Sequence, residues 1–424
     1  MDFDLPPELL SYLDELDRFI AAEIRPLEQT DDNIRFFDHR REDARTDWAR
    51  GGLPSQDWEA LLAEVRRRAD AAGHLRYAYP AEYGGRDGGI LAMAVIREHL
   101  ARQGLGLHND LQNEHSIVGN NVGLLLMLEY GTAKQQAEWV EKLATGDATF
   151  AFGITEPTHG SDATHMETTA RRNGDSWTID GEKTWNTGVH TATADLIFAR
   201  TSGQPGDADG ITAFLVPTDA DGFEILEYLW TFNMPTDHAH VRLTSVVVGD
   251  DAVFGEVGKG LAIGQTFFNE NRIRQAASSL GAAQYCVDRA VAYAKERAPF
   301  GKPLSSNQAI QFPLVELATQ CEMLRAFLHK TAWLMDRDGP MSASDKVSMC
   351  NYWANRLCCE AADRAMQVFG GWGYSRHQPF EHIYRHHRRY RITEGTEEIQ
   401  MRRVAGYLFG FMRGDLPKGV ARAN

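Results

Sequence analysis

The sequence predicts an α+β protein in which a sheet-rich segment lies between two helical ones. Apolar residues recur at three- and four-residue steps in the first third, short strand-like runs separated by turn residues fill the middle, and long helical periods return afterwards. A chain of 424 residues has room for about two to four domains. We therefore expect a helical domain over 1–147, a β domain over 148–256 and a helical bundle over 257–424.

The first predicted domain carries the pattern of amphipathic helices. In ELLSYLDELDRFIAAEIRPL (8–27) apolar residues follow the helical period as far as Pro26, and WEALLAEVRRRADAAG (58–73) repeats the pattern before a glycine. The N-terminus has no basic segment followed by an apolar one, and no apolar run approaches the length of a membrane span. We expect a cytoplasmic protein without membrane insertion.

The second predicted domain consists of short strands. The runs DLIFART (195–201) and ITAFLVP (211–217) are rich in β-branched and aromatic residues and end at turn residues. Asparagine, aspartate and glycine tolerate the backbone angles of tight turns. On this basis we expect two tight turns, at Asn173-Gly174 and at Asp180-Gly181.

The third predicted domain is again helical. Its periodicity indicates three long helices, over 261–297, 307–337 and 342–369. Prolines and glycines separate them, because neither residue type favours the interior of a helix. The breaks contain Pro299, Gly301 and Pro303, and then Gly339-Pro340.

Composition limits the partners of this chain. The 44 basic and 59 acidic residues give a net charge of −15, which argues against nucleic acid or an anionic membrane surface. The five cysteines form no CxxC pair or regular framework, so we interpret them as reduced thiols of a core. An anionic ligand would need arginines placed locally.

The stretch FAFGITEPTHGSDA (150–163) reads as a strand that opens into a Gly-Ser-Asp turn. Backbone N–H groups and hydroxyls of such a turn can face a phosphate or the polar edge of a ring. An ordinary exit from a strand into a loop explains the same residues equally well.

The stretch EKTWNTG (182–188) places Trp185 and Thr187 two residues apart on a strand, so that both point to one face. An indole beside a hydroxyl suits a flat aromatic cofactor that needs stacking and one hydrogen bond. The alternative is a buried tryptophan next to a satisfied threonine.

Two stretches of the third domain carry ligand-binding chemistry. ERAPFGKPLSSNQAIQF (296–312) brings Arg297, Phe300 and Gln308 around a glycine turn, and an arginine can bind a pyrophosphate bidentately. The alternative is a helix-breaking loop with a solvated arginine. QVFGGWGYS (367–375) adds a glycine pair that permits close approach of a ligand or another chain, or that ends a helix.

The stretch RYRITEGTEEIQ (389–400) places a single carboxylate, Glu394, between a basic run and a glycine. Thr396 is expected to cap the following helix, with Glu397 and Glu398 in its first turn, where the helix dipole favours negative charge. This local explanation covers the carboxylates after Gly395 and leaves Glu394 without a role.

Together with PAEYGGRDGG (80–89), these stretches in this order resemble the acyl-CoA dehydrogenase family of FAD-dependent flavoenzymes over nearly the whole chain. The resemblance implies a helical N-terminal domain, a central β-barrel or sandwich and a C-terminal four-helix bundle. It implies FAD as cofactor, an acyl-CoA as substrate and an electron-transfer flavoprotein as acceptor. It also implies a homo-oligomer, most readily a tetramer built from the C-terminal bundle, whose FAD lies between the β domain and the C-terminal helices.

The resemblance also assigns binding residues. Thr155 matches a position near the pyrimidine side of the flavin, Trp185 one that packs on the ring and Thr187 one near its N5. The full set of cofactor contacts implied is Phe152, Ile154, Thr155, Ser161, Trp185, Thr187, Thr396 and Glu398, with Arg297, Phe300, Gln308, Gln367, Gly370 and Gly371 reaching the FAD of a neighbouring subunit. The substrate contacts implied are Ser161, Phe268, Arg272 and Gly395.

Glu394 matches the catalytic base of this family. A thioester α-C–H is a weak acid, so its removal needs a desolvated carboxylate close to the α-carbon and stabilisation of the enolate-like oxygen. The resemblance gives the second task to the Glu394 backbone N–H and an FAD ribityl hydroxyl. Some relatives take the base from the position of Asn271, which cannot act as one, and Glu270 lies about 100° further round that helix.

Other interpretations remain beside this one. His382 and His386 could share a helical face and hold a metal with Glu381, although four nearby arginines oppose a cation. An acyl-CoA oxidase on the same scaffold would need access of oxygen to the reduced flavin. Monooxygenase relatives generally lack the base, so Glu394 counts against that branch. A non-catalytic acyl-CoA-binding protein would have kept the fold and lost the chemistry. His159 is either a residue that tunes CoA or acceptor contact or a loop histidine. The polar residues of 104–131 either meet the acyl group or cap helices; they are His108, Asn109, Asp110, His115, Asn120 and Asn121.

Overall fold

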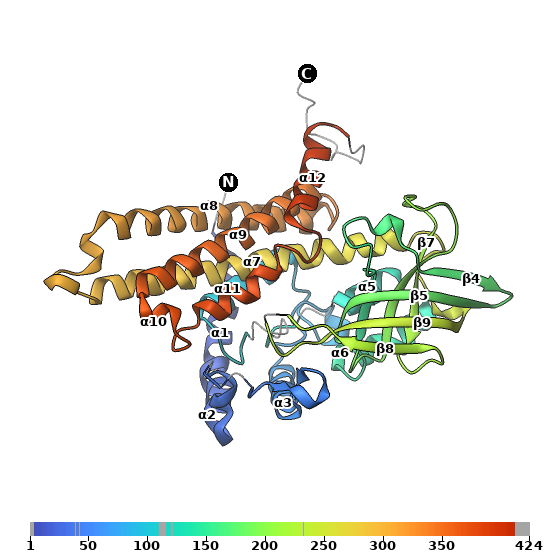
Figure 1. Ribbon diagram of the computed structural model, residues 1–424, viewed down its shortest axis with the longest axis horizontal. Helices are drawn as coiled ribbons and strands as arrows, with labels where there is room; N and C mark the ends of the chain where they lie inside the picture. The colour runs from blue at the N-terminus through green and yellow to red at the C-terminus, as the bar shows by residue number, and fades with distance from the viewer. Residues whose placement is uncertain are drawn as a thin grey trace. The chain divides into compact units, whose positions relative to one another are not determined.

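The computed structural model describes residues 4–38, 40–41, 43–109, 116–119, 122–231 and 233–411. The chain divides into two compact units (Figure 1). A helical unit comprises Met1–Ala44, Asp57–Asn120 and Asn269–Asn424, and a sheet unit comprises Arg45–Gln56 and Asn121–Phe268.

The N-terminal part of the helical unit is built from short amphipathic helices. Helix α1 buries Leu9, Tyr12 and Leu16, and the 3–4 spacing of these residues explains why one face of the helix packs. A π-helix over Ile20–Ile24 follows α1 directly. The helices are α1 (Pro7–Phe19), α2 (Arg25–Gln29), α3 (Gln56–Ala71) and α4 (Ile90–Arg102).

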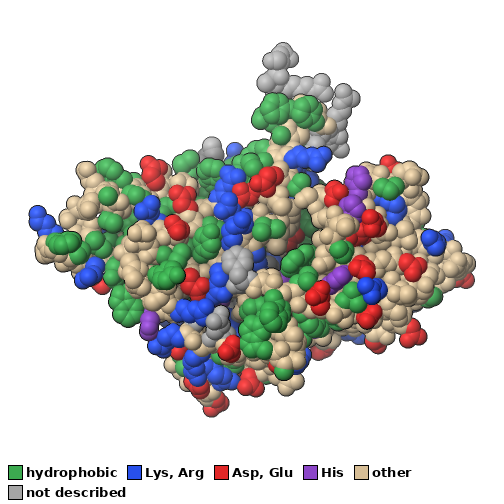
Figure 2. Space-filling view, in the orientation of Figure 1, with side chains coloured by type: hydrophobic (Ala, Val, Ile, Leu, Met, Phe, Trp, Pro, Cys, Tyr) green, Lys and Arg blue, Asp and Glu red, His purple; other side chains and the backbone are tan. Residues whose placement is uncertain are grey.

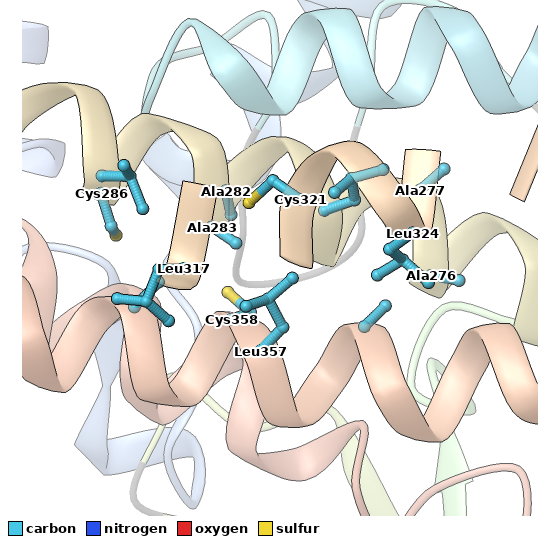
Figure 3. Packing of buried hydrophobic residues seen from close by; sticks show 14 of the residues in the cluster. Ala276, Ala277, Ala282, Ala283, Cys286, Leu317, Cys321, Leu324, Leu357 and Cys358 are labelled. Carbon is cyan, nitrogen blue, oxygen red and sulfur yellow. The ribbon is translucent and has the colours of Figure 1, made fainter. Parts of the chain in front are cut away.

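The C-terminal part of the helical unit contains the three long helices that the periodicity predicted. Each of their ends lies within two residues of the predicted position, so this prediction is confirmed. Small residues and thiols fill the space between them, which allows the helix axes to approach closely (Figure 3). The helices are α7 (Gly260–Glu296), which belongs to this unit from Asn269 onward, α8 (Gln308–Asp338), α9 (Ser344–Phe369), α10 (Gly371–Tyr374), α11 (Phe380–Arg389) and α12 (Glu397–Leu408).

The sheet unit is built around one eight-stranded sheet, in the strand order β10-β7-β6-β4-β5-β9-β8, with β3 paired to β6. Neighbours pair antiparallel except that β3 and β4 both run parallel to β6. Fully buried β6 and nearly fully buried β7 supply the centre of the core. The strands are β3 (Phe150–Gly153), β4 (Thr169–Asn173), β5 (Ser176–Thr187), β6 (Ala194–Arg200), β7 (Ile211–Pro217), β8 (Phe223–Tyr228), β9 (His238–Gly249) and β10 (Val253–Phe254).

One predicted turn is confirmed and the other is wrong. Asn173-Gly174 joins β4 to β5 with Gly174 at φ +63°. Gly181 instead lies inside β5, at a β-bulge opposite β9. The physical reason is close packing, because Gly181 has φ +151° and a Cβ there would lie 2.4 Å from the Thr168 hydroxyl.

A hairpin from the N-terminal third belongs to the sheet unit, which the sequence did not predict. Strands β1 (Thr46–Asp47) and β2 (Leu53–Pro54) flank a turn whose Gly51 oxygen accepts from the Trp230 indole N–H at 2.8 Å. Helices α5 (Val122–Tyr130) and α6 (Ala133–Thr145) complete this unit. A capping box of Thr132 and Gln135 begins α6.

No helix in the described part of the chain combines the length and the apolar composition that crossing a bilayer requires.

Candidate active site

The loop between α11 and α12 holds Glu394 in a constrained backbone conformation. Glu394 has φ +57° and Gly395 has φ +89°, so two successive residues are left-handed. The guanidinium of Arg272, on α7, donates from Nε at 2.9 Å and from Nη2 at 2.5 Å to the Glu394 carbonyl oxygen. These two bonds fix the peptide plane that follows the Glu394 side chain.

Two amides of α7 approach the Glu394 carboxylate. Asn271 Nδ2 and Gln275 Nε2 each lie 3.5 Å from Glu394 Oε1, at the long end of hydrogen-bond distances. Asn271, Arg272 and Gln275 are all buried. Neutral donors therefore face the carboxylate, and the nearby arginine is directed at the backbone.

The start of α12 has the capped structure that the sequence predicted. Thr396 Oγ1 accepts from the Ile399 N–H, so the N-cap is confirmed. Glu397 is buried between Arg391 and Arg356. Burial opposes its ionisation, yet the hydrogen bonds from these two arginines hold the pKa of Glu397 below its ordinary value. Glu398 is exposed.

In the sheet unit, Trp185 and Thr187 share an exposed face of β5, as their spacing predicted. The buried Asn186 separates them, and Trp185 is 49% exposed, so the alternative of a buried tryptophan is wrong. Trp185 lies at a bulge with φ +65°. Thr187 Oγ1 lies 2.9 Å from Nδ1 of His238.

The end of β3 is held next to this face. The Thr155 oxygen accepts from the Thr184 N–H at 2.9 Å. Phe152 stacks on Phe267, with ring centroids 3.9 Å apart, and meets Phe268 edge-on at 6.1 Å. Ile154 is buried, whereas Ser161 is exposed in the following turn.

A buried ion pair supports that turn from the interior of the sheet unit. Lys183 Nζ lies 2.9 Å from Glu156 Oε1 and donates to the Ile154 oxygen at 3.3 Å. Glu156 also accepts from the backbone N–H groups of Glu167 and Thr168. Its carboxylate is thus hydrogen-bonded through both oxygens. Glu156 therefore connects the end of the β3 segment to the residues just before β4.

The two ligand-binding stretches of the third predicted domain lie at the surface of the helical unit. Arg297 is exposed, and Phe300, with φ +55°, is 105% exposed. Gln308 is the first residue of α8, which Asn307 caps. A Cβ added at Gly370 or Gly371 would meet nothing within 4 Å. These groups are open to a ligand or to another chain; Gln367 is exposed beside them.

The histidines of α11 are core residues. His386 Nε2 lies 3.0 Å from the Tyr390 hydroxyl, and His387 Nδ1 lies 2.8 Å from the Ser279 hydroxyl. Burial and the charge of Arg389 lower the pKa of both histidines far below the ordinary value. Within the described ranges, no group of three or more His, Cys, Asp or Glu side chains could hold a metal ion.

Comparison with known proteins finds matches to one family along nearly the whole chain. Residues 6–147, 151–246 and 258–409 match the families described as the N-terminal, middle and C-terminal domains of acyl-CoA dehydrogenase. The mitochondrial short-chain specific acyl-CoA dehydrogenase of Bos taurus is 34% identical over 354 residues, which cover 82% of each chain. The glutaryl-CoA dehydrogenase of Desulfococcus multivorans is 30% identical over 404 residues, 94% of this chain and 96% of that one.

The chain belongs to the acyl-CoA dehydrogenase family. Among solved structures, the butyryl-CoA dehydrogenase of Megasphaera elsdenii superposes with a TM-score of 0.77 and 27% identity, covering 96% of this chain and 100% of that one. The predicted family and fold are therefore confirmed. As an acyl-CoA dehydrogenase, the protein is an FAD-dependent oxidoreductase.

The side chains of this acyl-CoA dehydrogenase fit a flavin dinucleotide. An exposed indole with a hydroxyl on the same face, Trp185 with Thr187, offers a stacking surface and a hydrogen bond to a flat ring. The exposed guanidinium of Arg297 suits a pyrophosphate. Figure 2 also shows basic side chains gathered in a band over the helical unit, although the chain as a whole is acidic.

Two groups of polar residues escaped the sequence reasoning. Lys183 and Glu156 read as ordinary strand and loop residues, although a lysine in the buried register of β5 was a usable signal. The second group is a set of buried amides and a hydroxyl under the Glu394 loop. Their helical spacing was visible in the sequence: Gln275 and Ser279 on α7, and Asn351 and Asn355 on α9.

Three predictions about polar residues have different outcomes. Arg272 is buried against the Glu394 carbonyl, and its contact with CoA stays a prediction. His159 bonds Asp162 at 3.1 Å within its own loop. His108 and Asn109 are buried, whereas Asp110, His115, Asn120 and Asn121 lie outside the described residues.

Proposed function

We propose that this acyl-CoA dehydrogenase oxidises an acyl-CoA thioester to a trans-2-enoyl-CoA, with Glu394 as the base that removes the α-proton. The observation that carries the proposal is the double clamp of Arg272 on the Glu394 carbonyl. The clamp holds two successive left-handed residues in place, one of them a glutamate, a residue type that seldom adopts this conformation. The constrained backbone directs one carboxylate and one peptide N–H in fixed directions.

The residues of this chain would divide the work as follows. The Glu394 carboxylate accepts the α-proton, and its backbone N–H donates to the thioester oxygen, where negative charge develops. Gly395 leaves room for the close approach of the substrate, and Phe268, Ser161 and Arg272 contact the CoA thioester. FAD, when bound, supplies the acceptor of the β-hydrogen as hydride.

We propose the same binding residues for FAD as the sequence indicates. In the sheet unit these are Phe152, Ile154, Thr155, Ser161, Trp185 and Thr187, of which Trp185 stacks and Thr187 bonds the ring. In the helical unit they are Thr396 and Glu398, and, for the FAD of a neighbouring subunit, Arg297, Phe300, Gln308, Gln367, Gly370 and Gly371. Their surface exposure supports this sharing between subunits.

The finer assignments are also proposals. The similarity to short-chain specific, butyryl-CoA and glutaryl-CoA dehydrogenases supports a short acyl group. Similarity to a subunit of a caffeyl-CoA reductase-Etf complex supports an electron-transfer flavoprotein as acceptor. We further propose a cytoplasmic homotetramer with functional domains over 1–147, 148–256 and 257–424.

The test is anaerobic flavin reduction by a panel of short, long, branched and cyclic acyl-CoAs, followed by flavin absorbance. Glu394→Gln should keep FAD and bind the thioester, yet lose roughly 10³-fold in reduction rate, because only the proton-accepting group changes. Glu360→Gln, which makes the same change at an exposed position of α9, is the matched control, and it should reduce at nearly the wild-type rate.

Two outcomes would contradict the proposal. Undiminished reduction in Glu394→Gln would assign the base elsewhere, with Glu270 the next candidate. A wild-type protein that reduces oxygen rapidly after thioester addition, and an electron-transfer flavoprotein slowly, would be an acyl-CoA oxidase on the same scaffold.

A further inference from the structure

A continuous line of buried polar side chains crosses the helical unit and ends at the Glu394 carboxylate. Its members come from three helices that pack around the loop, α7, α9 and α11, and each is at most 2% exposed. Polar groups are costly to bury unless each one is hydrogen-bonded. From the far end the line consists of His387, Ser279, Asn355, Asn351 and Gln275, and we call it the amide chain.

Backbone carbonyls fix how each amide is oriented. The Arg272 carbonyl lies 2.8 Å from the Asn351 side chain and the Tyr390 carbonyl lies 3.0 Å from that of Asn355. A carbonyl oxygen only accepts, so both facing atoms must be NH₂ groups. Asn351 Oδ1 then accepts from Asn355 Nδ2 at 3.1 Å.

The same argument extends to the residue next to the base. Asn351 Nδ2 also faces the Gln275 side chain at 3.3 Å, so the facing atom must be the acceptor Oε1. Gln275 therefore turns its NH₂ group toward Glu394 Oε1, 3.5 Å away. Gln400 supports this end, because its Nε2 donates to both the Gly395 oxygen and Asn351 Oδ1 at 2.9 Å.

The orientation of Asn355 also decides where the proton of His387 lies. Asn355 Oδ1 can only accept, so the Ser279 hydroxyl, 2.6 Å away, donates its single proton there. Nδ1 of His387, 2.8 Å from the same hydroxyl oxygen, must then donate to it. His387 is thus the Nδ1–H tautomer. Each hydrogen bond that links one member of the amide chain to the next is therefore donated in the direction of Glu394.

We propose that the amide chain is a positioning device for the catalytic base, which holds the Glu394 carboxylate in place and favours its ionised form. The inference rests on the role proposed above for Glu394. Gln275 is the positioning residue in contact with the carboxylate, and the other four act through it. Aligned hydrogen bonds polarise one another in a buried environment, so a change at Ser279 is felt at Glu394.

The direction in which hydrogen bonds are donated along the amide chain does not change near neutral pH. Burial and the charge of Arg389 lower the pKa of His387 to about 3, so its ring stays neutral. Three arginines carry charge near the base: Arg272 on the Glu394 carbonyl, Arg274 on Asn271 and, from α12, Arg403, whose charge acts on Arg272. Burial and Arg403 lower the pKa of Arg272 only to about 10, so it remains charged near neutral pH.

The first test measures the pH midpoint of anaerobic flavin reduction, with the thioester of the panel that reduces the wild-type holoenzyme fastest. Because the chain favours the anion, breaking it should raise the midpoint, by about one pH unit in Gln275→Met and about half a unit in Ser279→Ala. The control is Ser348→Ala, which removes a buried α9 hydroxyl that has no hydrogen-bond partner among the described residues. Its midpoint should equal that of the wild type.

The second test needs no turnover. In holoenzyme labelled with ¹⁵N-histidine, the signals that His387→Gln removes should show a protonated Nδ1 and an unprotonated Nε2 between about pH 6 and 8. An Nε2–H tautomer would overturn the direction of the chain and with it the proposal.

The outcomes separate this inference from the proposed function. If Gln275→Met and Ser279→Ala keep the wild-type midpoint while Glu394→Gln abolishes reduction, Glu394 is the base and the amide chain does not assist it. If Glu394→Gln reduces flavin at the wild-type rate, the proposed function fails, and the inference fails with it.

Discussion

At the scale of single residues, a buried lysine of the sheet unit interacts with two buried carboxyl groups. Lys183 is fully buried, and its ammonium group bonds the Glu156 carboxylate. Asp195 of β6 is fully buried as well and accepts a hydrogen bond from Asn186 Nδ2. Burial raises the pKa of Asp195 to about 7, against the opposing effects of the Asn186 bond and the Lys183 charge. Burial in the folded protein therefore keeps the Asp195 carboxyl group protonated at pH values below about 7.

This pKa makes a prediction about stability and pH. The folded protein binds the Asp195 proton more tightly than the unfolded chain, so the stabilisation is complete below the unfolded pKa, near 3.8, and is lost as pH rises toward 7. Asp195→Asn should therefore raise the free energy of unfolding by a few kcal/mol, on the order of 2–4, at pH 8 and by less at pH 5. Urea unfolding at the two pH values measures the difference.

The control for this experiment is Asp221→Asn, which removes the same charge from an exposed position of the sheet unit. It should give no gain that depends on pH. A gain for Asp195→Asn that is equal at both pH values would show that the buried carboxyl is not the titrating group.

At the scale of elements, α7, α8 and α9 meet through thiols and small side chains. Cys286, Cys321 and Cys358, one from each helix, lie in the same cluster among alanines and leucines (Figure 3). Burial raises the pKa of all three thiols, that of Cys321 to about 12. A thiol that is both buried and protonated reacts slowly with oxidants and disulfide reagents.

The native protein should therefore consume almost no disulfide reagent such as Ellman's reagent, whereas the unfolded chain should consume five equivalents, one for each cysteine. The rate of the native reaction should follow the rate of unfolding and rise with urea. Fast release of one equivalent from the folded protein would show that a cysteine is accessible, contrary to the burial of all five.

At this scale, elements set by local sequence signals were predicted correctly, and elements set by contacts between distant residues were not. Helices α7, α8 and α9 were predicted within two residues, because 3.6-residue periodicity and the prolines and glycines between them are local signals. Gly181 was misread because an Asp-Gly pair looks alike in a turn and in a bulge, and the contact with Thr168 that decides between them is not local. The hairpin over 45–54 was missed for the same reason, since its partner is Trp230.

In the candidate site, too, local features were predictable from the sequence and a contact between distant residues was not. The face that Trp185 and Thr187 share followed from their spacing, and the cap at Thr396 followed from its sequence. The bond between Arg272 and the Glu394 carbonyl joins residues 122 positions apart, and no local pattern encodes it. The sequence indicated Arg272 only as a contact for CoA, and that role stays a prediction.

At the scale of the whole molecule, α8 presents an apolar stripe to solvent. Phe312, Val315 and Met323 follow one another at helical spacing and are 57%, 58% and 68% exposed. Figure 2 shows hydrophobic side chains along the edge where Figure 1 draws α8. Such a stripe supports the proposed assembly of several copies through the C-terminal bundle.

Charge introduced into the stripe should separate the copies. The double substitution Val315→Arg with Met323→Arg should shift the molar mass, measured by light scattering during gel filtration, from that of the proposed tetramer toward the monomer of 47.4 kDa. If Arg297 and Phe300 bind the FAD of a neighbouring subunit, as proposed, cofactor retention should fall together with assembly. Leu10→Arg, at an exposed apolar position of α1, is the control and should leave the mass unchanged. An unchanged mass in the double variant would place the interface elsewhere.

The hairpin over 45–54 has a consequence for the order in which the protein can form. Its Gly51 bonds Trp230, 179 residues further along the chain, and its Trp48 packs edge-on against the same indole. Ribosomes add about 5–20 residues per second, so Gly51 emerges about 9–36 seconds before its partner. During this interval Trp48 stays exposed on a nascent chain, and the sheet unit becomes complete only after Phe268 has been synthesised.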